Sequence, residues 1–292
     1  MQKITPHLWF DKEAKEAAEF YTKLFDDSEI TNVTTLNNTP SGTVDIVSLK
    51  ILNYDYQFIS AGPLFKFTKA VSFHAVCNGA AEVDNLWDKL AVGGTVLMPI
   101  GSYPFSERYG WVQDKYGVSW QVIYRKDTKV TQRITPVLMF VEDVCGKTEE
   151  AVNFYTSIFH NSQIEGVFKY TNGEEPDKAG TVKYAAFALE NQNFGAMDSA
   201  RNHGFTFNEA ISFIIHCDTQ EEIDYYWYKL SSVPEAEQCG WLKDKYGVSW
   251  QVVPSDMGKY FAAGDAEKNA KITEAFLKMK KFDLAELRRV AE

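Results

Sequence analysis

Short apolar segments at residues 4–10, 71–77 and 118–123 carry the side chains best suited to chemistry in this chain. If each segment is a β-strand, residues two positions apart point to the same face. Each strand then presents imidazole, hydroxyl, amide or indole groups together. Two imidazoles that can be tuned near neutral pH, beside such groups, can hydrogen-bond a polar molecule. The candidate pocket-lining residues are His7, Trp9, Ser72, His74 and Gln121.

The same residues allow a sharper alternative, in which His7, His74 and Gln121 hold a divalent metal ion through two imidazoles and one amide. We prefer the interpretation without a metal, because hydrogen-bonded histidines explain the pattern equally well. No His-Glu-x-x-His, Gly-x-Ser-x-Gly, P-loop or Gly-x-Gly-x-x-Gly motif occurs in the sequence. Catalytic residues are therefore not assigned.

An internal repeat organises the elements that would position these side chains. Ile-Thr-Pro at 4–6 returns at 134–136, and the segment 110–122 returns at 240–252 with its Asp-Lys-Tyr-Gly-Val-Ser-Trp-Gln-Val core unchanged. Because the order of matching segments is kept, we interpret the chain as a tandem duplication of a whole domain. The predicted units are domain 1 at 1–127, domain 2 at 131–254, and a helical tail at 255–292.

Each copy is predicted to form a strand, a helix and further strands, and then the same pattern again. Apolar residues at helical spacing place the helices at 14–24, 82–90, 149–159 and 221–230. The copies differ in one place: 20 residues separate Leu90 from Trp111, against 10 between Leu230 and Trp241. The extra segment of the first copy could act as a lid over the pocket or as a plain connection.

Composition narrows the possible partners and the compartment. The chain has 30 Lys and Arg against 40 Asp and Glu, a formal net charge of −10. This acidic balance argues against nucleic-acid and membrane-surface binding. The four cysteines form no Cys-x-x-Cys pair, and no long apolar segment indicates a signal peptide or membrane span. We therefore expect a cytoplasmic protein.

These motifs together resemble those of a known superfamily. The repeated unit opens with Ile-Thr-Pro-x-Leu-x-Phe and has a helix ending in Phe-Tyr. Two such units in one chain resemble the vicinal oxygen chelate superfamily, which includes glyoxalases, bleomycin-resistance proteins and extradiol dioxygenases. Within it, Phe-Tyr-Thr-x-x-Phe, Gly-Val-Ser-Trp-Gln-Val and the tail segment 278–287 resemble the PhnB-like branch, which is also labelled 3-demethylubiquinone-9 3-methyltransferase. The resemblance covers nearly the whole chain.

The resemblance implies the fold and the assembly. Its fold class is α+β: two tandem glyoxalase-like domains, each a pair of βαβββ modules that form a half-open mixed barrel with a ligand cavity on the concave side. The two domains would pair as a pseudo-dimer within the chain, and a further homodimer stays open.

The resemblance also locates the family's metal positions, at Thr5, Ser72 and Gln121 in the first copy and Thr135, Ser212 and Gln251 in the second. These offer no carboxylate or imidazole, so no cofactor is expected. The second cavity would be more apolar and degenerate, because it would be lined by Val137, Met139 and Ile214.

We therefore expect the first domain to bind a small organic molecule without a metal, and we do not infer catalysis. Three alternatives stay open. One is a metal-dependent lyase, isomerase or dioxygenase that uses His7, His74 and Gln121. The second is a drug-sequestering resistance protein, and the third is a methyltransferase, as the family label says.

Overall fold

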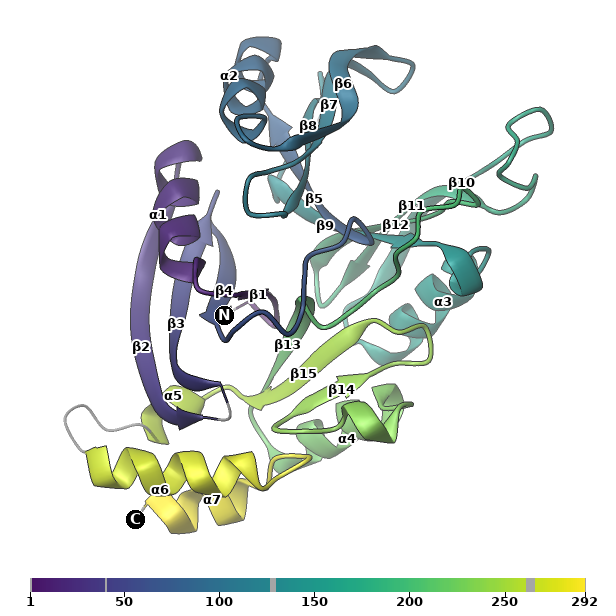
Figure 1. Cartoon of the computed structure of the whole chain (residues 1–292). Helices are drawn as coiled ribbons and strands as arrows, with labels where there is room; N and C mark the ends of the chain where they lie inside the picture. Colours follow the sequence, from purple (N-terminus) through teal and green to yellow (C-terminus); the bar gives the residue numbers. More distant parts are fainter. Residues whose placement is uncertain (1, 40, 127–129, 261–265, 292) are drawn as a thin grey trace.

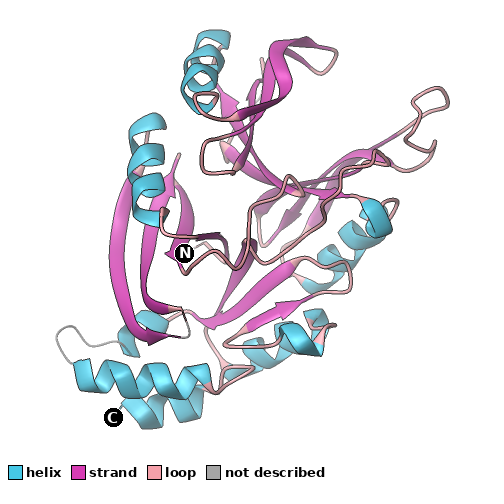
Figure 2. Cartoon of the chain, viewed as in Figure 1, coloured by secondary structure: helices cyan, strands magenta, loops and turns pink. Residues whose placement is uncertain are grey.

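The computed structural model describes residues 2–39, 41–126, 130–260 and 266–291, so the predicted domain end at 127 lies outside the described residues. Two mixed β-sheets carry helices on their outer faces (Figures 1 and 2). The strands of the first repeat are β1 (Ile4–Phe10), β2 (Glu29–Thr39), β3 (Gly42–Ile51), β4 (Tyr54–Ser60), β5 (Val71–Cys77), β6 (Thr95–Tyr103), β7 (Ser106–Gln113) and β8 (Ser119–Tyr124). Those of the second are β9 (Ile134–Phe140), β10 (Gln163–Lys169), β11 (Val182–Leu189), β12 (Gln192–Asp198), β13 (Ile211–Cys217), β14 (Trp241–Lys243) and β15 (Ser249–Pro254).

The helices fall where apolar residues recur at helical spacing. The first repeat contains α1 (Ala14–Leu24) and α2 (Ala80–Leu90), and the second contains α3 (Thr148–Ile158), α4 (Gln220–Leu230) and the 3₁₀ turns η1 (Glu142–Val144) and η2 (Pro234–Ala236). The tail contains α5 (Met257–Tyr260), α6 (Ala266–Leu277) and α7 (Leu284–Ala291). In α1, for example, Ala14, Ala17, Tyr21 and Leu24 are all buried on one side. That apolar side covers the sheet and forms the main core.

Each sheet combines strands of both repeats. The seven-stranded sheet has the order β14-β15-β13-β1-β4-β3-β2, and the eight-stranded sheet has the order β10-β11-β12-β9-β5-β8-β7-β6. Antiparallel pairs join the repeats: β1 lies against β13, and β5 lies against β9. The predicted glyoxalase-like architecture with paired βαβββ modules is confirmed. Each sheet, however, takes one module from each repeat.

A buried carboxylate keeps the two modules of one repeat together on the helix side. Asp114 Oδ1 accepts hydrogen bonds from the backbone N–H groups of Tyr116 and Val118 at 2.9 and 3.0 Å. Asp114 Oδ2 accepts from the Tyr21 hydroxyl at 2.5 Å and from Trp120 Nε1 at 3.0 Å. Asp114 therefore stabilises the turn that follows it, and the same side chain also holds α1.

The second repeat reproduces this arrangement. Asp244 accepts from the backbone N–H groups of Tyr246 and Val248, from the Tyr155 hydroxyl and from Trp250 Nε1. The sheets exchange modules between repeats, while these carboxylates connect modules within a repeat. The two repeats are thus tied together in both layers of the molecule.

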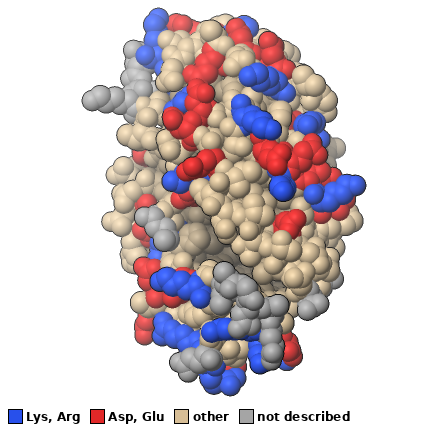
Figure 3. Space-filling view, turned by 90° about the vertical axis from the view of Figure 1, so that its left-hand side faces the viewer, with Lys and Arg blue, Asp and Glu red and all other residues tan. Residues whose placement is uncertain are grey.

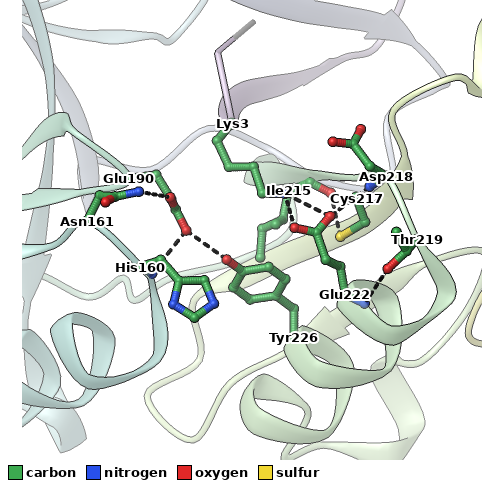
Figure 4. A network of polar contacts seen from close by, with 10 residues as sticks. All are labelled: Lys3, His160, Asn161, Glu190, Ile215, Cys217, Asp218, Thr219, Glu222 and Tyr226. Carbon is green, nitrogen blue, oxygen red and sulfur yellow. Dashed lines mark hydrogen bonds and ion pairs between the residues drawn. The ribbon is translucent and has the colours of Figure 1, made fainter.

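Ion pairs between the repeats reinforce the exchange. Lys3, just before β1, lies 3.0 Å from Glu222 on α4, and Figure 4 shows the two side chains pointing toward each other beside the Tyr226 ring. The Tyr226 hydroxyl donates to Glu190 at 2.8 Å. Glu222 also accepts a hydrogen bond from the backbone N–H of Asp218 at 2.7 Å. The equivalent pair at the other joint is Arg133 with Glu82.

The tail completes the edge of the seven-stranded sheet. Backbone N–H groups of Cys239 and Gly240 donate to the carbonyls of Met279 and Lys280 at 2.8 and 2.7 Å. In the eight-stranded sheet, the matching position of β7 pairs with β6 instead, where Tyr109 lies opposite Gly101. The tail segment thus takes the place of the strand that the shorter second repeat lacks. Helix α6 lies below the end of β2 (Figure 1).

On the surface seen in Figure 3, acidic and basic side chains lie in mixed groups, and uncharged areas lie between these groups. Among the described residues, no helix is both long and apolar enough to cross a membrane. The four cysteines are free thiols, and Cys77 and Cys217 are buried.

Candidate functional site

Because each sheet takes modules from both repeats, the residues of the predicted pocket lie in two different sheets. His7 and Trp9 lie in β1 of the seven-stranded sheet, whereas Ser72, His74 and Gln121 lie in β5 and β8 of the eight-stranded sheet. The five residues do not line one cavity, and the alternative metal set of His7, His74 and Gln121 does not form. Strand alternation predicted which residues share a face, but the strands next to each face come from the other repeat.

A second expectation is also wrong, for the same reason. Val137 and Met139 were assigned to an apolar cavity with Ile214, but β9 brings them beside β5, where Val137 lies opposite Ser72. Ile214 lies opposite Thr5 in the other sheet. The inner face of the eight-stranded sheet contains His74, and that of the seven-stranded sheet contains His7 and His216, whose Nε2 lies 3.0 Å from Thr5 Oγ1.

In the eight-stranded sheet, Gln121 is the centre of a buried polar network. Its Oε1 accepts a hydrogen bond from the Tyr109 hydroxyl at 2.6 Å and lies 2.6 Å from His74 Nε2. Its Nε2 donates to Ser72 Oγ at 2.8 Å. The side chains of all four residues are buried. Three strands, β5, β7 and β8, hold the network rigidly.

The network fixes the state of the His74 ring. Because Gln121 Oε1 only accepts, His74 Nε2 must carry the proton. Burial lowers the pKa of His74 to about 4, although the Gln121 hydrogen bond opposes this effect and the charge of Arg125 adds to it. The ring is therefore neutral at pH 7, so its Nδ1 is an acceptor. Among the described residues, that buried Nδ1 has no hydrogen-bond partner.

Tyr184 of β11 covers the face of this imidazole. The two rings are stacked, with their centroids 5.9 Å apart and their planes 11° apart. Gly195 of β12 makes the placement possible, because a Cβ there would lie 2.7 Å from the Tyr184 hydroxyl oxygen. Tyr184 belongs to the second repeat and His74 to the first, so no local sequence signal could have paired them.

The hairpin of β6 and β7 covers the rest of the inner face. Tyr103 and Phe105 at its tip lie 5.4 and 4.9 Å from the Tyr109 ring, both edge to face. A small hydrophobic cluster, separate from the main core, forms around Tyr109, Val76 and Ile123. The extra segment of the first repeat is thus part of the site. It supplies Tyr109, which the sequence analysis did not include.

The seven-stranded sheet holds a related but different arrangement. Gln251 Nε2 donates to Ser212 Oγ at 2.9 Å, and Ser212 Oγ lies 3.4 Å from His7 Nδ1. The His7 ring meets Trp241 edge to face at 5.3 Å. Burial lowers the pKa of His7 to about 3, so neither predicted histidine titrates near neutral pH. Trp9 lines a cavity of about 390 Å³ beside this site.

The donor set of the eight-stranded sheet does not fit a divalent metal. In the eight-stranded sheet, the positions expected for ligands are Thr135, Ser72 and Gln121, and the amide oxygen of Gln121 already takes two hydrogen bonds. Two hydroxyls and an occupied amide are poor ligands for such an ion. In the part of the chain that the structure describes, no group of three or more His, Cys, Asp or Glu side chains is placed to hold a metal.

Comparison with known proteins identifies the family. A family model described as 3-demethylubiquinone-9 3-methyltransferase matches residues 2–123 and again 132–253. The chain belongs to this family. The predicted PhnB-like membership and tandem organisation are confirmed, and no curated protein matches the chain.

Two solved structures illustrate the relationship. A PhnB protein from Bacillus cereus is 39% identical over 42% of this chain and 100% of its own, with a TM-score of 0.40. Glyoxalase I from Zea mays is 14% identical over 87% of this chain and 94% of its own, with a TM-score of 0.53. The second shows the fold across both repeats.

Proposed function

We propose that this PhnB-like protein binds a small organic molecule on the inner face of the eight-stranded sheet, without a metal ion. The observation that carries the proposal is the unpartnered Nδ1 of His74. A buried acceptor without a donor costs about 1–3 kcal/mol. A ligand hydroxyl or N–H group would remove that cost.

The surroundings of His74 define what would fit. Tyr103, Phe105, Tyr109 and Tyr184 supply aromatic walls, so a planar ring with one hydrogen-bond donor suits the site. The nitrogen is covered in this structure. Binding therefore requires Tyr184 or the side chains of the β6–β7 hairpin to move aside.

The test compares phenol with anisole, which has the same ring and oxygen but no hydroxyl donor. Ligand-observed NMR should detect phenol binding to the wild-type protein and much weaker binding of anisole. His74→Phe should abolish this preference. His7→Phe, in the other sheet, should keep it. Both variants should first show cooperative unfolding, so that a lost signal is not a lost fold.

Treatment with a chelator should leave phenol binding unchanged. The proposal fails if phenol and anisole bind equally, if His7→Phe removes the preference, or if the purified protein contains a stoichiometric metal that binding requires. The last outcome would favour a metal-dependent enzyme of the same fold.

A further inference from the structure

One end of the eight-stranded sheet differs from the matching end of the seven-stranded sheet in several residues at once. The sheets are related by the internal repeat, so each position has a counterpart in the same chain. The counterparts on the seven-stranded side are small or apolar and come without a hairpin. The pairs are Tyr109 with Cys239, Arg125 with Ser255, and Tyr184 with Ile46.

Of these residues, Arg125 lines a cavity of about 420 Å³ between the tip of the β6–β7 hairpin and the end of β8, together with Tyr103 and Phe105. Tyr103 and Phe105 stack on each other there, with centroids 5.7 Å apart, and Phe105 is 60% exposed. The volume lies within the range of small-molecule sites. An exposed, stacked aromatic pair gives such a cavity a ready surface for a ligand ring.

Arg125 supplies a free positive charge to this cavity. Lys126, also in the lining, is already paired with Glu107 at 3.3 Å. Arg125 is exposed and forms no ion pair with any residue that the structure describes. The cavity therefore has a net positive lining in a chain whose formal net charge is −10.

The cavity adjoins the polar network through two of its lining side chains, Tyr103 and Phe105. Tyr103 and Phe105 contact Tyr109, whose hydroxyl donates to Gln121 beside His74. On the other side, burial raises the pKa of Tyr184, and the charge of Arg125 partly opposes this effect. A molecule in the cavity would thus contact Arg125 on one side and, on the other, the two rings that pack on Tyr109.

We propose that the ligand of this site carries a carboxylate, which Arg125 binds while the ligand's ring lies against Tyr103 and Phe105. The inference rests on the proposed function and adds the charge of the ligand. A guanidinium presents paired N–H donors that match the two oxygens of a carboxylate. An acidic protein repels anions elsewhere, so a local cation is needed to hold one.

The experiment uses benzoate and benzamide, which share size and ring but differ in charge. By calorimetry on the full chain at low salt, benzoate should bind about tenfold more tightly than benzamide, a difference of about 1.4 kcal/mol. Arg125→Gln should lower benzoate affinity to that of benzamide. Arg289→Gln removes the same charge from an exposed position in the tail and should change neither. Raising the salt concentration should weaken benzoate alone.

Phe105→Ala should weaken both probes, which locates them at the hairpin tip. Equal affinities for the two probes, no benzoate binding, or equal effects of the two arginine variants would overturn the inference. Phenol binding that depends on His74 would survive each of those outcomes. The failure of the carboxylate inference is therefore distinguishable from the failure of the proposed function.

Discussion

Replacing His74 with phenylalanine should make the protein more resistant to acid without destabilising it at neutral pH. Phenylalanine keeps a buried ring beside Tyr184 and removes the unpartnered Nδ1, whose burial costs about 1–3 kcal/mol. The variant loses the hydrogen bond to Gln121, worth about 1 kcal/mol. Gln121 Oε1 still accepts from Tyr109. At pH 7.5, the free energy of unfolding should therefore be equal to the wild-type value or higher by up to about 2 kcal/mol.

Acid should enlarge the difference. Burial lowers the pKa of His74 from 6.5 to about 4 in the folded protein. Below pH 6.5 the unfolded chain takes up a proton at this residue, whereas the folded chain does not until near pH 4. Stability is therefore lost as the pH falls through this range. Between pH 7.5 and 5.0, His74 costs the wild type about 2 kcal/mol that the variant keeps.

Urea unfolding at pH 7.5 and 5.0 measures this difference. Comparing the wild type with the variant at both pH values cancels the contributions of the other titrating groups to the change in stability. One of these is Asp114, because burial raises its pKa to about 6 and its contribution therefore has the opposite sign. His7→Phe should gain acid stability in the same direction, because burial lowers the pKa of His7 to about 3. A gain below about 0.5 kcal/mol for His74→Phe would refute the linkage reasoning.

Two further substitutions test the architecture around the site, both by urea unfolding. Asp114→Asn should lower the free energy of unfolding by about 2–3 kcal/mol, because the new amide N–H would face the Trp120 N–H, whereas the carboxylate oxygen accepts a hydrogen bond from it. Asp244→Asn should lower it by a similar amount. A loss under about 1 kcal/mol in both variants would contradict this account. Gly195→Ala should lower the free energy of unfolding by about 1–2 kcal/mol, because its Cβ would lie 2.7 Å from the Tyr184 hydroxyl oxygen. Adding Tyr184→Phe to this variant should recover part of the loss. No recovery would mean that the strain lies elsewhere.

The fold was predictable because local pattern and repetition agree. Alternating residues in β1 place Ile4, Leu8 and Phe10 in the main core and leave His7 on the opposite face, as the sequence indicated. The spacing of buried residues in the helices marks the side that covers each sheet. These features depend only on neighbours along the chain, and the duplication repeats the same patterns in both halves of the sequence.

The pairing of modules was not predictable in the same way. The two candidate partners of β1 carry nearly the same sequence, Val-Ser-Phe at 71–73 and Ile-Ser-Phe at 211–213. Hydrophobic pattern cannot distinguish them, so His7 was placed with His74 when it lies beside Ser212. Tyr184 and Arg125 were missed for a related reason. Their contacts join the two repeats, and the spacing of residues along the sequence does not reveal such contacts.

The internal repeat also provides an argument about His74 that one domain alone would not. Its counterpart in the seven-stranded sheet is Ile214, which is buried and needs no hydrogen bond. The fold therefore accepts an apolar residue at this position. In that sheet, His7 has Ser212 beside its Nδ1, and His216 Nε2 lies 3.0 Å from Thr5 Oγ1, so both inner histidines have polar partners. His74 instead retains an unsatisfied nitrogen under an added hairpin and a stacked tyrosine. A cost that the fold can avoid elsewhere supports the proposed role of His74 in binding, because stability is commonly given up where function requires it.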